Sequence, residues 1–182
     1  ARRQRQMCIR DSAKSIYEIP IYYKNQNIDE YILKKLKVPH KKSVIKPWVT
    51  FTNKLRKCNR KVKIGMIGKY VDLADSYKSL NESLLHASVH NNNSLEIDFI
   101  DSEDITKKSI NRLKNLPGIV VPGGFGNRGV EGKILAANFA RINDIPYFGI
   151  CLGMQISVIE FARNILGLKD ANTSAFAAAV KP

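Results

Sequence analysis

Two kinds of hydrophobic pattern alternate along the last two thirds of the chain. Continuous short apolar runs, typical of buried strands, occupy residues 62–67, 95–100, 118–121 and 146–150. After each run comes a stretch with apolar residues at helical spacing, at 76–91, 102–116, 130–142 and 152–166. Apolar strands that alternate with helices form a parallel sheet covered on both faces. We therefore predict an α/β fold with a parallel sheet and helices on both faces.

The first 61 residues follow a different pattern. Residues 28–36 place apolar side chains on one helical face, which predicts a helix. Pro39 and Pro47 then interrupt any regular pattern, so residues 39–61 are interpreted as a linker. We expect three parts: the end of a preceding domain at 1–38, a basic linker at 39–61, and an α/β domain at 62–182.

The positive charge of the chain is unevenly distributed. The formal net charge is +14, but residues 1–63 carry 18 Lys and Arg against 4 Asp and Glu, whereas the remainder is balanced at 12 against 12. The excess therefore lies outside the predicted α/β domain, and a solvated basic linker is the preferred interpretation. A nucleic-acid adaptor is the alternative; it predicts steeply salt-dependent binding that is lost when residues 1–61 are removed.

Several classes of protein are disfavoured by the sequence. No run of about 18 apolar residues is present, so we expect no membrane-spanning helix, and the basic N-terminus lacks the apolar stretch of a secretory signal. Cys8, Cys58 and Cys151 are too dispersed for a disulfide framework or zinc site, which favours a cytoplasmic setting. His86 and His90 have ligand-like spacing, but no Cys or carboxylate cluster accompanies them, and we predict no metal site.

One candidate nucleophile lies between the fourth predicted strand and helix. Gly149-Ile-Cys151-Leu-Gly153 has the spacing of a nucleophile elbow, with a thiol in place of the serine hydroxyl. The tight turn requires small residues two before and two after the nucleophile. The free N–H groups at the start of the next helix favour a thiolate, and the N–H of Leu152 is placed to bind an oxyanion. A buried structural cysteine is the alternative interpretation.

A glycine-rich loop, Pro122-Gly-Gly-Phe-Gly-Asn-Arg-Gly129, follows the third predicted strand. Its G-x-G-x-x-G spacing formally matches a dinucleotide fingerprint, but that fingerprint belongs after the first strand of its fold. Loops at the carboxyl ends of parallel strands share one crevice, so Gly124 is predicted to supply a second oxyanion donor beside Cys151. A nucleotide-binding module remains an alternative, and predicts NAD or ATP binding that survives Cys151→Ala.

These motifs resemble those of class I glutamine amidotransferases, and within that class the CTP synthase family. The elbow 149–155 fits several members, whereas three further stretches narrow the resemblance: 63–70 followed by 75–79, then 121–132, and then 145–151. Upstream, residues 15–20 and 28–32 resemble the end of the synthetase domain of that family.

The resemblance implies a role for each matched residue. Cys151 corresponds to the nucleophile that forms a glutamyl thioester, with Leu152 and Gly124 as the oxyanion hole. The glutamine pocket is lined by Gly124, Phe125, Leu152 and Gln155. Gly126 and Arg128 belong to a loop that the family uses as a mobile lid, which responds to GTP.

The resemblance also implies the setting of the whole enzyme. The family makes CTP from UTP, ATP and glutamine, and ammonia passes from the amidotransferase domain to the synthetase domain. We expect no cofactor in this fragment, ATP and Mg²⁺ in the synthetase domain, and a cytoplasmic homotetramer for the complete enzyme. The expected partners are glutamine and the remainder of the chain, with neither membrane nor nucleic acid.

The sequence departs from the family at three places. The His and Glu of the Cys-His-Glu triad lie beyond Pro182, and Ala175 replaces a glutamine-binding Glu. Residues 1–14 and 175–182 do not follow the family, and we hypothesise that both ends are foreign to the gene. We therefore expect this chain to lack steady turnover of glutamine.

Overall fold

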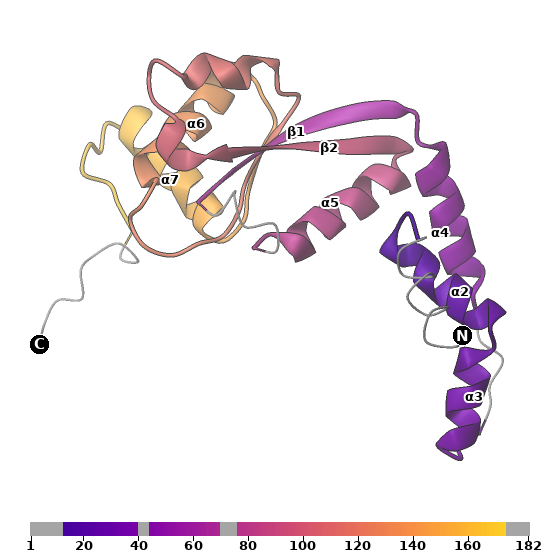
Figure 1. Ribbon diagram of the computed structural model, residues 1–182. Helices are drawn as coiled ribbons and strands as arrows, with labels where there is room; N and C mark the ends of the chain where they lie inside the picture. The colour runs from indigo at the N-terminus through magenta and orange to yellow at the C-terminus, as the bar shows by residue number, and fades with distance from the viewer. Residues whose placement is uncertain (1–12, 40–43, 70–75, 174–182) are drawn as a thin grey trace, which may run out of the picture. The chain divides into compact units, whose positions relative to one another are not determined.

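The computed structural model describes residues 13–39, 44–69 and 76–173 (Figure 1). The chain divides into two compact units. The first comprises residues 1–60 and 86–94, and the second comprises residues 61–85 and 95–182.

The second unit is built on a four-stranded sheet with the order β2-β1-β3-β4. Its strands are β1 (Arg60–Gly68), β2 (Asn93–Asp101), β3 (Ile119–Val121) and β4 (Tyr147–Gly149). The central pairs are parallel: Met66 of β1 aligns with Val120 of β3, and Val120 aligns with Phe148 of β4. The predicted parallel sheet is confirmed, with strand limits within two residues of those expected.

Helices cover both faces of this sheet. On one face, α6 (Val130–Ile142) joins a buried cluster with Ile67 and Val121. Gly68, the next residue along β1, faces the opposite side of the sheet. A β-carbon on Gly68 would overlap the ring of Tyr77, which directly precedes α5 (Lys78–His90), so this second face is covered near α5. The last helix, α7 (Leu152–Asn164), packs against α6, β3 and β4. The helix predicted at 130–142 is confirmed residue for residue.

The helix predicted at 102–116 is wrong. Two short 3₁₀ helices replace it, η2 (Ser102–Asp104) and η3 (Ile110–Asn115). Asp101 caps η2 by accepting a hydrogen bond from the N–H of Glu103. Side-chain hydrogen bonds between Thr106 and Ser109 compete with helical ones in between. Apolar residues at 110, 113 and 116 keep a three-residue spacing, which suits a 3₁₀ helix.

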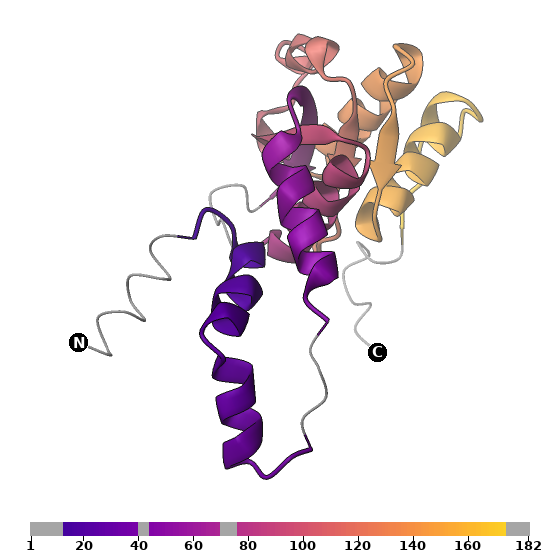
Figure 2. The same ribbon diagram turned by 90° about the vertical axis from the view of Figure 1, so that its right-hand side faces the viewer.

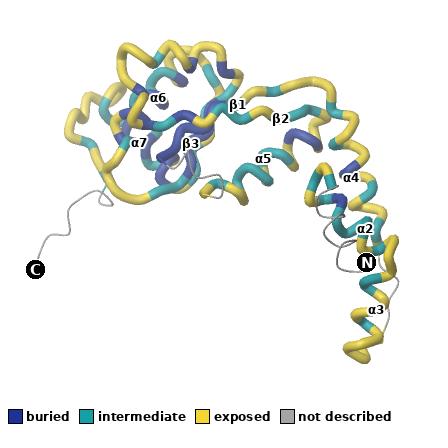
Figure 3. Tube along the Cα trace, viewed as in Figure 1, coloured by how far each residue is buried: buried dark blue, intermediate teal, exposed yellow. Residues whose placement is uncertain are grey.

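The first unit contains four helices among its described residues: η1 (Ile16–Glu18), α2 (Ile19–Asn25), α3 (Ile28–Lys35) and α4 (Lys46–Lys57). Figure 2 shows them in indigo and purple, and Figure 3 shows that α3 is largely exposed. The helix predicted at 28–36 is confirmed. The irregular linker predicted at 39–61 is wrong for α4, because Pro47 lies in the first turn, where proline is tolerated. The division into domains stays a prediction.

An aromatic cluster joins η1, α4 and the end of α5 within the first unit. The ring of Tyr17 stacks with Trp48 at 6.1 Å between centroids and meets Phe51 edge to face at 4.8 Å. Buried Glu18 accepts hydrogen bonds from Arg56 at 2.6 and 3.2 Å, which lower the pKa of the Glu18 carboxyl. Tertiary packing of this kind explains why residues 46–57 are helical.

Candidate active site

Cys151 occupies the turn between β4 and α7 in a rare backbone conformation. Its φ of 52° and ψ of −104° lie outside the regions that residues with a side chain normally adopt. Such strain persists only where the surrounding structure enforces it. The Cys151 side chain is exposed, so the turn presents its thiol to solvent as a nucleophile elbow does. The alternative of a buried structural cysteine is wrong.

The two flanking glycines are required by close backbone packing. A β-carbon on Gly149 would overlap the backbone of Gly153 and Met154, and one on Gly153 would overlap the carbonyl of Val121. α7 therefore starts directly against the ends of β3 and β4. This is the physical reason for the small residues expected on either side of Cys151.

The glycine-rich loop lies beside the elbow. A β-carbon built on Gly123 would lie 3.5 Å from Cβ of Cys151, and one built on Gly124 would lie 3.8 Å from Cδ2 of Leu152. The proximity follows from the pairing of β3 with β4, because both loops leave the same edge of the sheet. The structure thus brings together Gly124, Cys151 and Leu152, as the sequence predicted.

Several main-chain N–H groups at this place, those of Gly124 and Leu152 among them, donate no backbone hydrogen bond to another described residue. In contrast, Gly153 donates to Ile150 and Gln155 donates to Cys151. Paired N–H donors beside a nucleophile stabilise the oxyanion of a tetrahedral intermediate. The arrangement can therefore support acyl transfer to a thiol.

The two other residues predicted to line a substrate pocket differ in their surroundings. Phe125 is 90% exposed. Gln155 lies one turn into α7, and its Oε1 accepts a hydrogen bond from Thr173 at 3.0 Å. The roles of both residues stay predictions.

The predicted lid residues are held by a lysine that the sequence did not single out. The Lys69 amine donates to the carbonyls of Phe125 and Gly126, and Arg128 donates to the Lys69 carbonyl at 2.5 Å. Arg128 also lies 3.5 Å from a Glu103 carboxylate oxygen. Burial, and then the charge of Arg128, lower the pKa of the Lys69 amine. Its only sequence signal was a place within a motif stretch, directly after the first strand.

No base accompanies Cys151 in the described part of the chain. Neither a histidine nor a carboxylate is hydrogen-bonded to its thiol there. His86 instead contacts the Tyr17 hydroxyl at 2.5 Å through Nε2. Residues 13–39, 44–69 and 76–173 also hold no group of three side chains suited to a metal ion, and no helix long and apolar enough to cross a membrane.

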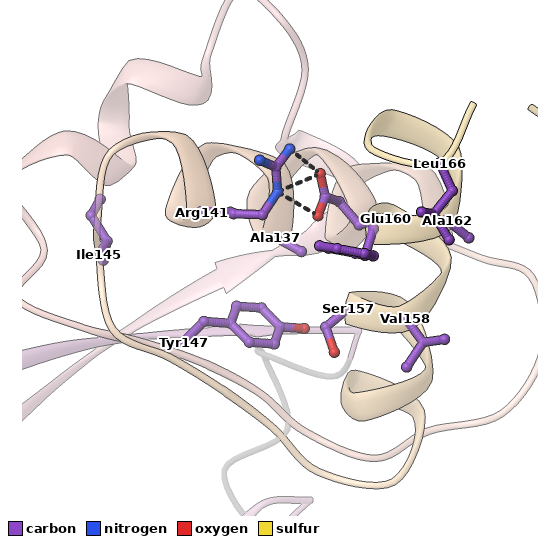
Figure 4. A pocket seen from close by; sticks show the side chains of 10 residues that line it. Ala137, Arg141, Ile145, Tyr147, Ser157, Val158, Glu160, Ala162 and Leu166 are labelled. Carbon is purple, nitrogen blue, oxygen red and sulfur yellow. Dashed lines mark hydrogen bonds and ion pairs between the residues drawn. The ribbon is translucent and has the colours of Figure 1, made fainter. Parts of the chain in front are cut away.

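Figure 4 shows a pocket whose lining residues include neither Cys151 nor its flanking glycines. It has a volume of about 570 Å³ and is formed by α6, α7 and β4. At one side Arg141 donates to both carboxylate oxygens of buried Glu160, at 2.8 to 3.2 Å, and Asn138 adds a further hydrogen bond. Neither Cys151 nor the glycine-rich loop lines this pocket, so we assign it no part in the chemistry at Cys151.

Comparison with known proteins agrees with this geometry. Residues 72–180 match the family model of glutamine amidotransferase class-I, and the chain belongs to that family. It is 48% identical over 164 residues to a CTP synthase of Nitratidesulfovibrio vulgaris, an alignment that covers 90% of this chain and 30% of that protein. It also resembles the solved glutaminase domain of Trypanosoma brucei CTPS with bound acivicin. That match has a TM-score of 0.61 and 44% identity, and it covers 64% of this chain and 46% of the other.

Proposed function

We propose that Cys151 is the nucleophile of a glutamine amidotransferase site. One observation carries the proposal: an exposed thiol on a strained turn lies beside the N–H groups of Gly124 and Leu152, which donate to no backbone carbonyl among the described residues. The Cys151 thiolate attacks the side-chain carbonyl of glutamine, and the two N–H groups bind the oxygen as it gains negative charge. The C–N bond then breaks, the departing nitrogen takes one proton from water and leaves as ammonia, and a glutamyl thioester remains on Cys151.

The relatives suggest what the ammonia is for. The similar proteins are named as a CTP synthase and as the glutaminase domain of a CTPS. The chain spans about a third of the length of the first and less than half of the second. We propose that the ammonia serves the ATP-dependent amination of UTP to CTP, with ATP and Mg²⁺ held by a synthetase part of the whole enzyme.

Turnover needs a proton donor and acceptor at Cys151, and the described residues place none there. Release of ammonia and hydrolysis of the thioester both depend on a positioned base, normally a histidine. The chain contains His40, His86 and His90; His40 lies outside the described residues, and the His86 ring is engaged by Tyr17. We propose that the chain is acylated at Cys151 slowly and at most once.

A coupled ammonia assay on the purified chain tests this proposal. The expected result is a slow release of no more than one equivalent of ammonia per chain, lost in Cys151→Ala and retained in Cys58→Ala. Many equivalents of ammonia that depend on Cys151 would contradict the limit of one acylation. Equal release from the wild type and Cys151→Ala would contradict the assignment of the nucleophile.

A further inference from the structure

We infer that Lys69 is a positioning residue that holds the glycine-rich loop in the conformation from which Gly124 serves Cys151. The inference rests on the function proposed for Cys151 and adds a residue that neither the motifs nor the comparisons assign. Lys69 does not reach the reacting atoms: its amine is bound to the backbone of the loop.

The strand order places Lys69 where it can act on this loop. Lys69 directly follows Gly68, the last residue of β1, and the loop directly follows β3. β1 and β3 are parallel neighbours, with Met66 aligned to Val120, so both segments leave the same edge of the sheet. A side chain immediately after β1 therefore meets the loop beside Cys151.

The contacts run in both directions. The Lys69 amine donates to the carbonyl of Phe125 at 2.5 Å and to that of Gly126 at 2.9 Å, while the Lys69 carbonyl accepts from Arg128. Hydrogen bonds from a charged donor are about twice as strong as neutral ones. Lys69 thus binds the loop on both sides of Gly126, whose φ of 75° marks a sharp change of direction.

Fixing these two carbonyls fixes the two peptide planes that contain them, Phe125–Gly126 and Gly126–Asn127. A peptide group is planar, so orienting the Phe125 carbonyl also orients the N–H of Gly126, and the same holds for the next plane. Gly124 is one residue away from the first of these planes. The backbone torsions of Gly124 and Phe125 separate the Gly124 N–H from that plane, so the hold of Lys69 on the loop narrows, and does not by itself fix, the directions open to this N–H.

The burial of Lys69 argues against an incidental contact. The residue is 5% exposed, and removing an ammonium group from water is costly unless it is well hydrogen-bonded. Lys63 of β1 shows the contrast, because its side chain is 46% exposed and pairs with Glu96 and Asp98 at 3.6 Å. Lys69 differs in that its described acceptors are both carbonyls of the glycine-rich loop.

Two labelling rates separate positioning from general structural support. A glutamine-mimicking chloroketone reacts with Cys151 through a tetrahedral adduct that uses the oxyanion site, whereas iodoacetamide needs only an accessible thiolate. We expect Lys69→Met to slow chloroketone labelling of Cys151 by about 10- to 100-fold, the range for a misplaced catalytic group, and to leave iodoacetamide labelling near the wild-type rate. Lys69→Arg, which keeps charged donors, should restore part of the loss, and Lys63→Met should have no effect.

Each outcome decides between distinct explanations. An unchanged ratio of the two rates in Lys69→Met overturns the inference, whether both rates fall together or neither changes. Should Lys69→Met fail to fold, Lys69→Gln and Lys69→Arg are judged by the same ratio. Wild-type protein that shows no preference of the chloroketone for Cys151 would refute the proposed function itself, and this inference with it.

Discussion

At the scale of single residues, the site depends on backbone positions that only certain side chains allow. Cys151 was predicted as the nucleophile from two flanking glycines, and the structure gives the reason, since a β-carbon at Gly149 or Gly153 would overlap the neighbouring backbone. Lys69 escaped prediction because its importance arises from a contact 56 residues away, with Phe125. The spacing of glycines around Cys151 reflects local backbone geometry and is visible in the sequence. A hydrogen bond from Lys69 to a distant main-chain carbonyl leaves no such pattern of residue types.

Substitution of Gly124 tests the oxyanion donor at this scale. A β-carbon at Gly124 meets only Cδ2 of Leu152, at an ordinary 3.8 Å. Gly124→Ala should therefore react with the chloroketone at nearly the wild-type rate. Gly124→Val adds two methyl groups beside Leu152 and should slow the reaction on the order of 100-fold, the effect of losing one oxyanion donor. Equal rates for Val and Ala variants would show that Gly124 has no such role.

At the scale of elements, hydrophobic periodicity predicted most of the sheet and its helices, and it failed where tertiary packing decided. The helix prediction for residues 130–142 was correct because their apolar residues form one strong helical face, which is visible in the sequence alone. The prediction of one helix at 102–116 failed because side-chain hydrogen bonds break it into two 3₁₀ helices. The prediction of a linker over 46–57 failed because Pro47 was interpreted as a helix breaker, whereas it lies in the first turn of α4. The roles of Phe125 and Gln155 stay predictions, since a pocket cannot be read from local spacing.

The close packing of the start of α7 on β3 predicts that even a small side chain at Gly153 destabilises the protein. Gly153→Ala should destabilise the protein by about 3 kcal/mol, at the upper end for overpacking, because the new methyl group would overlap the Val121 carbonyl. Gly118→Ala is the matched control, since its β-carbon would lie 3.6 Å from the nearest atom, the Pro146 carbonyl oxygen. Urea unfolding followed by circular dichroism measures both, and equal midpoints would contradict the close packing of α7 on β3.

At the scale of the whole molecule, buried charge makes stability depend on pH. Lys133 of α6 is 1% exposed. Burial, and then the charge of Lys69, lower the pKa of the Lys133 amine from 10.5 to about 8, against an opposing effect of Asp101. Between these two values the unfolded chain binds more protons than the folded one, so the free energy of unfolding rises with pH in this window. The contribution of Lys133 is complete above pH 10.5 and is lost as the pH falls through about 8.

Lys133→Met should remove this dependence. The wild-type protein is expected to gain up to about 3 kcal/mol from Lys133 across the window, since each pKa unit corresponds to about 1.4 kcal/mol. The variant lacks that gain and should be the more stable protein at pH 7. Urea unfolding of both proteins between pH 7 and 10 gives the comparison. Parallel stability curves would mean that Lys133 is not a buried ammonium in the folded state.

Selective labelling shows whether Cys151 is a nucleophile set to attack a glutamine side chain. The native chain would be treated with the glutamine-mimicking chloroketone, digested, and mapped by mass spectrometry at each of its cysteines, Cys8, Cys58 and Cys151. We expect Cys151 to be modified well before the other two thiols, and excess glutamine to slow its modification. Equal modification of all three thiols, or a Cys151 that reacts only after unfolding, would contradict it.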